Sequence, residues 1–502
     1  NTINLGDGTH PLAANTTVAA LYGGNKTAAG NTLNVNTSAR VGTIGNFSTV
    51  TFKNASSKLT LTQAGASIDL DTIKAGFAAT EREDVLVESA NGLTLQGGKT
   101  FRTDLSADGT KETNIEARSG NKEIVRYGYT FKDARTATTV GADTWGGRSK
   151  AGNTTTGNEI ALSSGTYTNV YGGWTSGAGS TADSSKQKSS TLNKVTVSGT
   201  ASVNGTVYGG FTDVAGGNAM GNTVTATNNL NADIVGGKSA GEASHNTVTV
   251  GSAAVNSITG GDGATTKDNT VNIDGATVAN KIVGGTQADG TDNTLNVRGV
   301  NTAQNIGGFQ KLHFDTTGVT GTMLTLNDGM NKTKVDWNTL TVGGSGYNIT
   351  LLKNAAGIDF GGTYTDGAVK SGLSADQQSE INVGVSADKK AITYSGLSFT
   401  GATQTLVDGT GAYGGISKAG NATHHNAITV HGNYDAVYGG HTSGTSDTAV
   451  EKKHSHDNTV TITGGTLGTV YGGYTQIADG TTNDNTINLG DGTHPLAANT
   501  TV

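Results

Sequence analysis

The sequence predicts an all-β protein, a right-handed parallel β-helix (β-solenoid) of roughly 20 coils with two less regular insert regions. Three observations carry this prediction. A sequence pattern recurs with a step of 23 or 24 residues, each copy holds short runs of alternating apolar and polar residues, and each copy closes on a Gly-Gly pair. A fixed period in this range, with two brief strands per period, is typical of a solenoid.

The repeat is clearest in residues 246 to 308. Asn246, Asn269 and Asn293 each open a strand-like run, and a second apolar patch in each copy precedes the Gly-Gly pair. The alternating apolar positions are Val248 and Val250, Val271 and Ile273, and Leu295 and Val297, and the pairs are Gly260-Gly261, Gly284-Gly285 and Gly307-Gly308.

One copy cannot stand alone, because so short a run buries too little apolar surface to offset the entropy of ordering the whole repeat. Stacked copies share backbone hydrogen bonds and one continuous core, and the parallel crossovers between them predict right-handed winding. We expect the Gly-Gly pairs at corners that need a positive φ or a tight bend. We expect the opening Asn residues at a second corner, where their stacked side chains form an amide ladder.

The composition suits many corners around a thin core. Of 502 residues, 77 are Gly and only 33% are hydrophobic. Gly has no three-residue period and the chain has 2 Pro, which excludes collagen. The absence of Cys excludes a disulfide framework, a zinc knuckle and a thiol nucleophile. A net charge of −7 with interspersed signs gives no electrostatic case for nucleic acid, and no apolar run reaches membrane-spanning length.

Residues 1–18 and 485–502 are identical, both reading NTINLGDGTHPLAANTTV. Two interpretations stay open: tandem copies of a 484-residue repeat, or one segment entered at both ends of a repeating assembly. In both, the end of residues 1–484 leads back into their start. The chain begins at Asn1 rather than Met and shows no signal peptide, so we expect it to be a piece of a longer protein.

The repeat itself contains two related halves. Residues 31–52 resemble residues 293–314 without a gap, and the stretches 145–153 and 413–421 resemble each other where coils resume. The predicted segments are coils in 1–54, an irregular β-solenoid segment in 55–144, regular coils in 145–314, a second irregular segment in 315–412, coils in 413–484, and the start of the next repeat in 485–502. Strand-like runs are expected at Leu59–Leu61, Val85–Val87, Ile349–Leu352 and Ile381–Val383, and strands and loops rather than a helix at 72–83. Polar insertions at 176–190 and 443–457 are expected on one face of the coils.

Four phrases resemble the passenger domains of large repetitive bacterial autotransporter adhesins. They are NTVTITGGTLGTVYGGYT (458–475), NIGGFQKLHFD (305–315), TMLTL (322–326) and NITLLKNAAGI (348–358). The resemblance covers most of the chain, and its motifs describe architecture rather than activity. It implies a β-helix that is secreted through the outer membrane by a C-terminal β-barrel, although no such barrel is visible in this sequence.

Two sets of residues suggest metal sites. Six of the ten His lie in 424–456: His424, His425, His431, His441, His454 and His456. They suggest a divalent-metal site, but exposed loop positions are favoured, because the slot of His441 holds Trp174, Phe211, Lys238 and Tyr474 in other coils. The pairs Asp268-Asn269, Asp292-Asn293, Asp457-Asn458 and Asp484-Asn485 could hold Ca²⁺. Turn capping is favoured for them, because the Gly-Gly-x-Gly-x-Asp calcium repeat is absent.

Other chemistries have weaker support. The acidic cluster Glu81, Glu83, Asp84 and Glu88 could line a cleft, as in β-helix polysaccharide lyases and hydrolases, but a solvated loop is favoured. The Gly-Asp-Ser-Gly pattern of some autotransporter serine proteases is absent. Aromatic residues at the Gly-Gly positions could stack on sugars or on each other; they are Tyr171, Trp174, Tyr208, Phe211, Tyr438, Tyr471 and Tyr474. Thr arrays would suit ice binding, but the variable coil length argues against a lattice match.

These observations favour a structural and adhesive segment of a bacterial cell-surface or extracellular fibre. We predict no enzyme activity and assign no catalytic, cofactor-binding or metal-binding residue and no cofactor. The expected partners are neighbouring identical repeats or subunits end to end, and host-surface, bacterial or glycan ligands, without nucleic acid and without a membrane-spanning segment in this chain. The alternative is a β-helix carbohydrate-active enzyme, either a polysaccharide lyase or a hydrolase.

Overall fold

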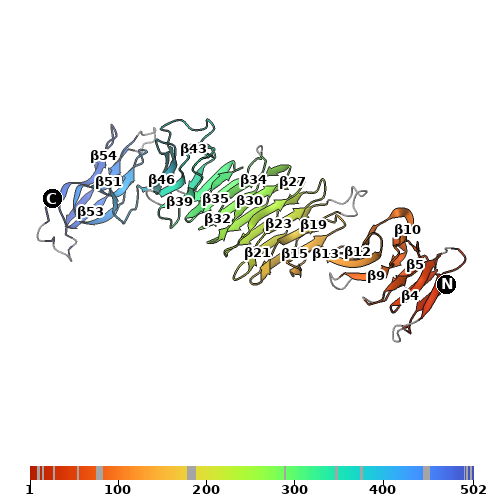
Figure 1. Ribbon diagram of the computed structural model, residues 1–502. Helices are drawn as coiled ribbons and strands as arrows, with labels where there is room; N and C mark the ends of the chain where they lie inside the picture. Colours follow the sequence, from red (N-terminus) through yellow and green to blue (C-terminus); the bar gives the residue numbers. More distant parts are fainter. Residues whose placement is uncertain are drawn as a thin grey trace. The chain divides into compact units, whose positions relative to one another are not determined.

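The structure is a computed structural model, drawn as a ribbon in Figure 1. It describes residues 1–7, 12–13, 16–26, 29–53, 56–74, 83–177, 188–287, 290–344, 349–373, 377–444, 453–490, 492, 496–497 and 500–501. The chain forms two compact units. Unit 1 holds Asn1–Val271 and Val283–Asn293, and unit 2 holds Asn272–Ile282 and Thr294–Val502.

Nearly all regular elements are strands, and most of them pair in parallel. Within the described ranges the helical segments are two single-turn 3-10 helices, η1 (Leu70–Thr72) and η2 (Gln96–Gly98). The predicted all-β architecture with stacked parallel strands is therefore confirmed.

Unit 1 begins with two parallel ladders. The first is β1 (Thr2–Leu5), β3 (Thr32–Val35), β5 (Thr49–Phe52) and β8 (Ile73–Lys74), and the second is β2 (Thr17–Tyr22), β4 (Ala39–Gly45), β6 (Leu59–Leu61) and β9 (Asp84–Glu88). A short parallel pair joins β7 (Ser67–Ile68) to β10 (Thr94–Leu95). The predicted runs Leu59–Leu61 and Val85–Val87 are thus strands, while residues 75–82 of the stretch 72–83 lie outside the described residues.

The parallel phase stops after β9. Three antiparallel strands follow it in the same sheet, in the spatial order β13 (Glu123–Thr130), β12 (Lys111–Arg118) and β11 (Phe101–Leu105). This meander explains why the repeat period is lost in the first irregular segment: its strands return by hairpins instead of by crossovers.

The regular sequence repeats of unit 1, called coils below, present three strand positions each, and equivalent strands lie side by side (Figure 1). The first ladder is β15 (Asp143–Ser149), β19 (Val170–Thr175), β23 (Thr206–Thr212), β26 (Asp233–Lys238) and β30 (Ser257–Asp262), with β14 (Thr138–Val140) antiparallel at its edge. The second is β17 (Glu159–Leu162), β21 (Lys194–Val197), β25 (Thr223–Ala226) and β28 (Thr247–Val250). The third is β16 (Thr155–Thr156), β20 (Ser190–Thr191), β24 (Ala219–Met220), β27 (Glu242–Ser244) and β31 (Thr265–Lys267), and β18 (Thr166–Tyr167) pairs with β22 (Ser202–Val203). Three more strands continue these ladders: β32 (Thr270–Asp274) pairs with β28, β34 (Lys281–Gly285) pairs with β30, and β29 (Ala254–Val255) pairs with β33.

Unit 2 repeats the plan of unit 1. Four parallel strands, β33 (Thr277–Val278), β36 (Asn301–Ala303), β39 (Thr322–Leu326) and β42 (Ile349–Asn354), are followed by the antiparallel strands β46 (Ala391–Ser398), β45 (Ser379–Val385) and β44 (Lys370–Leu373). A second parallel ladder is β35 (Thr294–Arg298), β38 (Lys311–Asp315) and β41 (Thr341–Gly343), β40 (Thr333–Lys334) pairs with β43 (Ile358–Asp359), and β37 (Asn305–Gly307) completes this part. The order matches β9, β13, β12 and β11, which supports the two related halves seen in the sequence.

The last coils of unit 2 form three parallel ladders. They are β48 (Gly411–Ser417), β51 (Tyr434–Thr442) and β54 (Leu467–Thr475), with β47 (Leu406–Asp408) antiparallel at the edge; β49 (Thr423–His424), β52 (Ser455–His456) and β55 (Thr482–Asn483); and β50 (Ala427–His431), β53 (Thr459–Gly464) and β56 (Thr486–Leu489).

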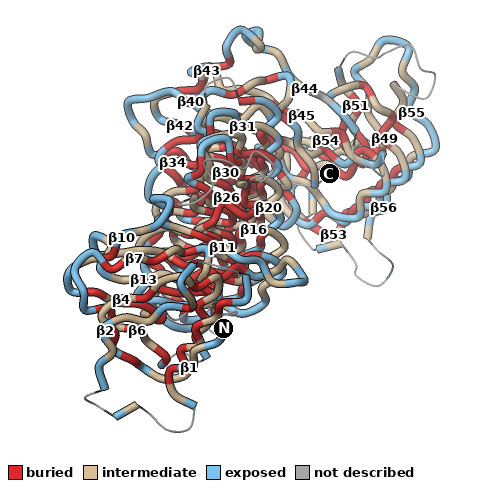
Figure 2. The backbone as a smooth tube through the Cα atoms, turned by 90° about the vertical axis from the view of Figure 1, so that its right-hand side faces the viewer, coloured by how far each residue is buried: buried red, intermediate tan, exposed pale blue. Residues whose placement is uncertain are grey.

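The core is a column of apolar side chains inside the stacked strands. In β21, β25 and β28 the inward residues Val195, Val224 and Val248 pair in register and are each 0% exposed. Figure 2 shows the buried residues in red along strands such as β26 and β30. Each fully buried Val or Ile contributes about 1.5 to 3 kcal/mol relative to an exposed one, so stability accumulates coil by coil.

A buried ladder of Asn side chains runs beside this core, as the sequence predicts. In unit 1 the Nδ2 of each Asn donates to the Oδ1 of the next, at 2.7 to 3.0 Å and across 35, 29, 24, 23 and 24 residues. The members are Asn158, Asn193, Asn222, Asn246, Asn269 and Asn293. In unit 2, Asn426, Asn458 and Asn485 form the same ladder at 2.7 and 2.9 Å. All ladder members of unit 1 are 1% exposed or less.

Most of the Gly-Gly pairs do not lie at corners with positive φ, so that expectation is wrong for them; it holds for Gly307-Gly308, in which Gly308 has a φ of 67°. Gly172 and Gly173, for example, lie within β19 and are not among the positive-φ glycines. A Cβ on Gly172 would meet the carbonyl oxygen of Gly209 at 2.3 Å, and a Cβ on Gly173 would meet the amide of Asn193 at 2.4 Å. The first Gly therefore has no side chain because the backbone of the neighbouring strand occupies that space. The second has none because the side chain of a ladder Asn occupies it.

The corner residue is the one before each ladder Asn. Asp268, Asp292 and His245 have φ of 53°, 58° and 56°, and Gly157 and Gly221 occupy the same position earlier in unit 1. Asp, Asn and Gly accept this left-handed conformation at the lowest cost. The ladder Asn residues themselves do not have positive φ, which corrects the expectation that they form the corner.

Candidate functional sites along the coils

The aromatic residues beside the Gly-Gly pairs of unit 1 stack on one another. The ring of Tyr171 lies 4.5 Å from that of Trp174 at 22° and 5.2 Å from that of Tyr208 at 12°. Phe211 contacts Tyr208 edge-on at 5.1 Å. Burial, with the nearby Asp143 carboxylate, raises the pKa of Tyr171 to about 12. The two faces of Tyr171 are used inside the protein, so this column is primarily a structural feature.

One cation joins this aromatic column at its start. The guanidinium carbon of Arg148 lies 4.8, 4.4 and 4.0 Å from the ring centres of Tyr129, Trp145 and Trp174. Such cation–π contacts contribute about 0.5 to 2 kcal/mol each, depending on how dry the site is. Arg148 therefore bonds the antiparallel meander, through Tyr129, to the first two regular coils.

The corresponding column of unit 2 contains a histidine. Tyr413, Tyr438 and Tyr471 stack at 5.1 and 5.2 Å with interplanar angles of 8° and 7°, and His441 stacks on Tyr474 at 5.2 Å and 10°. The Nδ1 of His441 is buried and has no hydrogen-bond partner among the described residues. Burial, and to a lesser extent the charge of Lys418, holds the pKa of His441 below its ordinary value.

Replacing His441 with Phe is expected to make the last coils more stable at acidic pH than they are in the parent chain. The folded pKa of His441 is depressed, so between its ordinary value of about 6.5 and that lower value the unfolded chain binds the proton first. Its contribution is therefore complete above about pH 6.5 and is lost as the pH falls. Thermal unfolding of both proteins at pH 7 and pH 5 measures this, with His441→Phe showing the smaller loss. The converse variant Phe211→His is expected to introduce the same loss of stability at acidic pH in unit 1. Equal pH dependence of the stability of all three proteins would contradict a lowered pKa of His441.

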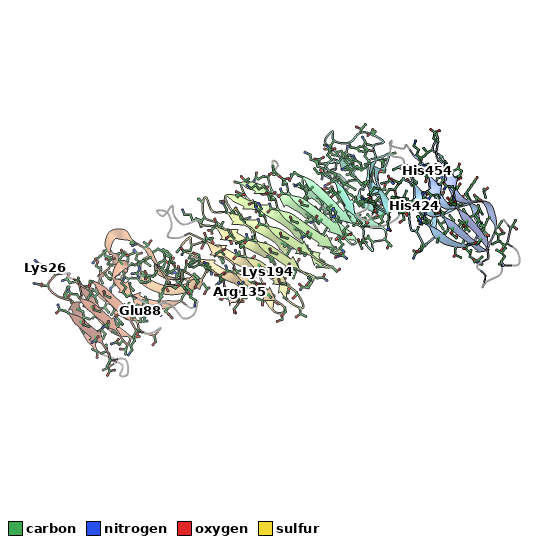
Figure 3. The ribbon with its side chains drawn as sticks, turned by 180° about the vertical axis from the view of Figure 1, so that it is seen from behind. Lys26, Glu88, Arg135, Lys194, His424 and His454 are labelled. Carbon is green, nitrogen blue, oxygen red and sulfur yellow. The ribbon has the colours of Figure 1, made fainter. Side chains whose placement is uncertain are left out.

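The structure brings three of the predicted histidines together. His424 stacks on His456 at 5.2 Å, the Nδ1 atoms of His424 and His425 lie 2.7 Å apart, and His456 Nδ1 lies 2.8 Å from the carboxylate of Asp457. His454 accepts from the amide of Thr481 at 3.2 Å; it is labelled with His424 in Figure 3. Within the described residues, no group of three or more His, Asp or Glu side chains is arranged to hold a metal ion.

The Asp-Asn pairs divide their roles. Asp268, Asp457 and Asp484 supply the left-handed corner, and the following Asn joins the ladder. Asp268 lies 3.4 Å from His245, and Asn483 donates to Asp484 at 2.7 Å. These contacts are those of capped turns rather than of a converging oxygen cage.

The predicted acidic cluster is paired with basic residues. Arg118 donates to Glu83 at 2.7 Å, Arg126 donates to the buried Asp84 at 2.7 Å, and Lys58 donates to Glu88 at 2.9 Å. The hydrogen bond from Arg118 lowers the pKa of Glu83, and the one from Lys58 lowers the pKa of Glu88. Glu81 lies outside the described residues. The pairs of Glu83 and Asp84 thus hold β12 and β13 of the meander to the start of β9. Glu88, which also accepts from Thr60 at 2.8 Å, holds β9 to β6.

Sequence reasoning missed two buried carboxylates, Glu112 and Glu380, which are 1% and 0% exposed. Glu112 accepts from the side chains of Asn114, Ser149 and Asn153 and from the amide of Lys150, at 2.7 to 2.8 Å. Glu380 accepts from the equivalent groups of Asn382, Ser417, Asn421 and Lys418, and also from the amide of Ala419. Each Glu therefore binds the Ser-Lys-Ala-Gly-Asn turn that opens a block of coils.

The sequence contains a pattern that marks Glu112 and Glu380. Both halves carry a Glu-x-Asn triplet, at 112–114 and at 380–382, at the same distance before the Ser-Lys-Ala-Gly-Asn turn. The resemblance of the two turns at 145–153 and 413–421 was recognised, whereas the carboxylate that each turn binds lies in the preceding meander.

Two cavities lie within single units. One of about 470 Å³ in unit 1 is lined by polar residues that include Arg40, Glu88, Lys122 and Glu123. Another of about 420 Å³ in unit 2 is lined mainly by Gly, Ser, Thr and Ala, with Gln404 as its largest polar side chain.

Comparison of the chain with protein-family models, with curated proteins and with solved structures gives no match. The helical segments within the described part of the chain are too short and too polar to cross a bilayer. The functional argument therefore depends on the geometry above.

Proposed function

We propose that this chain is a structural and adhesive segment of a bacterial cell-surface or extracellular fibre. Its coils wind as a right-handed parallel β-helix, and successive 484-residue repeats continue end to end into a rod. The right hand follows from the parallel crossovers between equivalent strands.

The continuous columns along the coils carry this proposal. The Asn ladder and the stacked tyrosines repeat one contact at every coil. The ladder and the stacked rings stiffen the protein along the stacking direction, and each of their contacts joins only neighbouring coils. It suits a protein whose task is length and display, because it places nothing reactive in the core.

Adhesion would come from many weak contacts along such a rod. The polar insertions predicted at 176–190 and 443–457 would supply these contacts; residues 178–187 and 445–452 of them lie outside the described residues. Repeating a weak loop contact on successive repeats raises the effective concentration at a surface and multiplies the overall affinity.

Electron microscopy of the native material at its source tests the proposal. With about 24 residues per coil and ~4.8 Å between coils, fibres should show an axial repeat near ~100 Å. Isolated rods attached to a cell surface would restrict the proposal to a stalk. Globular particles without a rod would contradict it.

The alternative, a β-helix carbohydrate-active enzyme, has one observation in its favour: Glu88 and Glu123 line the same cavity of unit 1. Glu88 is held by Lys58 and Thr60 with a lowered pKa, which suits a base or nucleophile rather than a general acid. Release of reducing or unsaturated ends from acidic polysaccharides, lost in Glu123→Gln, would establish this alternative.

A further inference from the structure

The cavity of unit 1 lies on one row of polar side chains. Direct strand pairing places four residues of neighbouring strands in this row: Arg40 of β4, Thr60 of β6, Glu88 of β9 and Glu123 of β13. Successive residues of a strand point to opposite faces of the sheet, and Leu61, next to Thr60, is buried. The row therefore lies on the outer face of the sheet, where Glu88 is labelled in Figure 3.

Two turns, at 89–92 and 119–122, border this row and complete the cavity. Asn91 of the first turn and Lys122 of the second line the cavity together with the row. A backbone hydrogen bond of 2.8 Å from the first turn to the carbonyl of Lys122 joins the two turns. The Nδ2 of Asn91 donates to the carbonyl of Thr62 at 3.1 Å. These bonds hold both turns in place, so the cavity of about 470 Å³ is preformed and has the size of a small-ligand site.

The two carboxylates of the row differ in their partners. Glu88 accepts from Lys58 at 2.9 Å with one oxygen and from the hydroxyl of Thr60 at 2.8 Å with the other. Glu123 accepts one longer hydrogen bond, from the hydroxyl of Ser119 at 3.3 Å. Glu123 therefore keeps most of its acceptor capacity for a ligand.

The cations of the cavity outnumber its carboxylates. Arg40 and Lys122 are exposed, and their side chains have no hydrogen-bond or ion-pair partner among the described residues. With Lys58, three cations face the two carboxylates Glu88 and Glu123, so the local net charge is +1 in a chain whose formal net charge is −7. Such a cavity favours an anionic ligand over a cationic one.

The strand pairing does not require these charges. Unit 2 pairs β36, β39, β42 and β46 in the same way, and its row is Thr302, Thr325, Lys353 and Ala391. Three of the four positions therefore differ in charge from unit 1. The cation of the second turn is retained as Lys390, whose carbonyl accepts the equivalent backbone hydrogen bond. Because the same framework forms with a different row, holding the strands together does not explain the row of unit 1.

The free groups of the cavity specify the chemistry of the ligand. A guanidinium such as that of Arg40 binds a carboxylate through two parallel hydrogen bonds. An ammonium donates to hydroxyl groups and a carboxylate accepts from them, which suits Lys122 and Glu123. The apolar members of the lining are Leu61 and Ala90, so an apolar ligand has little to contact. A ligand that carries hydroxyl groups and one carboxylate satisfies all three free groups together.

We propose that this cavity binds a short acidic saccharide that contains a uronic acid, and that it does so without cleaving it. The uronate carboxylate binds Arg40, and the sugar hydroxyls bond with Lys122, Glu123 and Asn91. The proposal rests on the adhesive role proposed above and specifies the class of its ligand. Successive repeats present the cavity many times, so a weak site of this kind gives strong overall attachment.

Titration of the full chain with uronate trisaccharides tests the proposal. The probes are the trimers of galacturonate, glucuronate, mannuronate and guluronate, and the matched probes are their methyl esters, which have nearly the same shape but no negative charge. We expect at least one acid form to bind, more weakly as salt is added. Its ester should bind about tenfold more weakly, because the charge-assisted bonds to Arg40 are lost. Mass spectrometry should recover the bound trisaccharide intact.

Substitutions in unit 1 assign the binding to this cavity. Arg40→Ala should weaken binding of the acid form about tenfold, and Arg40→Lys should have an intermediate effect, because Lys keeps the charge but not the planar pair of donors. The matched control is Arg135→Ala, which removes an exposed Arg that does not line the cavity, and it should bind as the parent chain does. Hydrogen exchange over β4 and β6 should be unchanged in all three variants, since both side chains are exposed.

Each result decides the proposal. Failure of all four acid forms to bind, equal binding of an acid form and its ester, or equal losses in Arg40→Ala and Arg135→Ala would overturn it. Cleavage of a trisaccharide would also overturn it, in favour of the enzyme. Fibres or rods at the natural source without saccharide binding would remove this site and leave the proposed function standing. Saccharide binding by a protein that forms neither would keep the site and remove the fibre.

Discussion

Replacing Asn246 with Ala is expected to destabilise the regular coils of unit 1 by about 3 to 4 kcal/mol. Asn246 Oδ1 accepts from both the amide and the Nδ2 of Asn222 at 3.0 Å. Its own Nδ2 donates to Asn269 Oδ1 and to the carbonyl of Ala219, also at 3.0 Å. Without the side chain, the Asn222 amide loses this acceptor in a site without water access, and such a buried group costs about 1 to 3 kcal/mol.

The loss should remain local to the neighbouring coils, because each coil contacts only its nearest neighbours. A single global midpoint is a poor measure of such an array. Hydrogen exchange followed by mass spectrometry over peptides from β24 to β27 is the better measurement, and faster exchange there than in β15 or β19 is expected.

The matched control is Asn296→Ala. Asn296 donates to Asn272 at 2.7 Å, but this pair lies on the outer, half-buried side of the strands. Its removal leaves groups that water can reach, so we expect a cost below about 1 kcal/mol. Equal effects of the two substitutions would show that the buried ladder has no special role.

The sequence predicts correctly those parts of the fold whose residues recur at equal steps along the chain. The inward positions Val248 and Val250 and the Asn ladder through Asn246, Asn269 and Asn293 follow from one pattern recurring at equal steps, because each residue meets its own counterpart in the next coil. Stacking makes the long-range contact a local feature of the repeat, so composition and spacing suffice to predict it.

The same reasoning failed where a contact joins unlike positions. The glycines of the Gly-Gly pairs were assigned to corners, because Gly is most often required for its φ. In the structure Gly173 is required because the amide of Asn193 packs against its Cα. That constraint comes from the neighbouring coil and leaves no mark on the local turn pattern.

Among the candidate sites, the aromatic positions were recognised and their mutual stacking was one of the two interpretations left open. Tyr171 and Tyr208 show that stacking is the outcome. Glu112 was missed for a different reason. It lies in an antiparallel strand that follows no repeat period, and its partners at Ser149 and Asn153 are 37 and 41 residues away. A repeat period in the sequence therefore cannot predict that Glu112 contacts these residues.

Replacing Glu112 with Ala is expected to produce the second large loss, about 3 to 5 kcal/mol in the first coils that follow the meander. The carboxylate accepts four hydrogen bonds in a site that is 1% exposed. Removing it leaves the hydroxyl of Ser149, the amide of Lys150 and two Asn side chains without this acceptor. The turn at 149–153 should then exchange its amides faster, because the charge that orders its donors is gone.

Glu112→Gln separates the shape of the side chain from its acceptor capacity. The carboxamide fills the same space, but its NH₂ group faces donors where the carboxylate oxygen accepted two bonds, so we expect an intermediate loss of about 2 to 3 kcal/mol. Glu380→Ala should reproduce the loss in unit 2, since Glu380 binds the equivalent turn at 417–421.

The control for the carboxylate is Glu159→Ala. Glu159 forms ion pairs with Lys194 at 2.8 Å and Arg135 at 3.3 Å, both labelled in Figure 3, on the exposed surface of the coils. Exposed pairs contribute little to folding, so hydrogen exchange of the turn at 149–153 should be unchanged in this variant. If Glu112→Ala leaves the amides of that turn as protected as Glu159→Ala does, then the buried carboxylate does not hold the coils to the meander. The contacts of Arg148 with Tyr129, Trp145 and Trp174 would then be what joins the two.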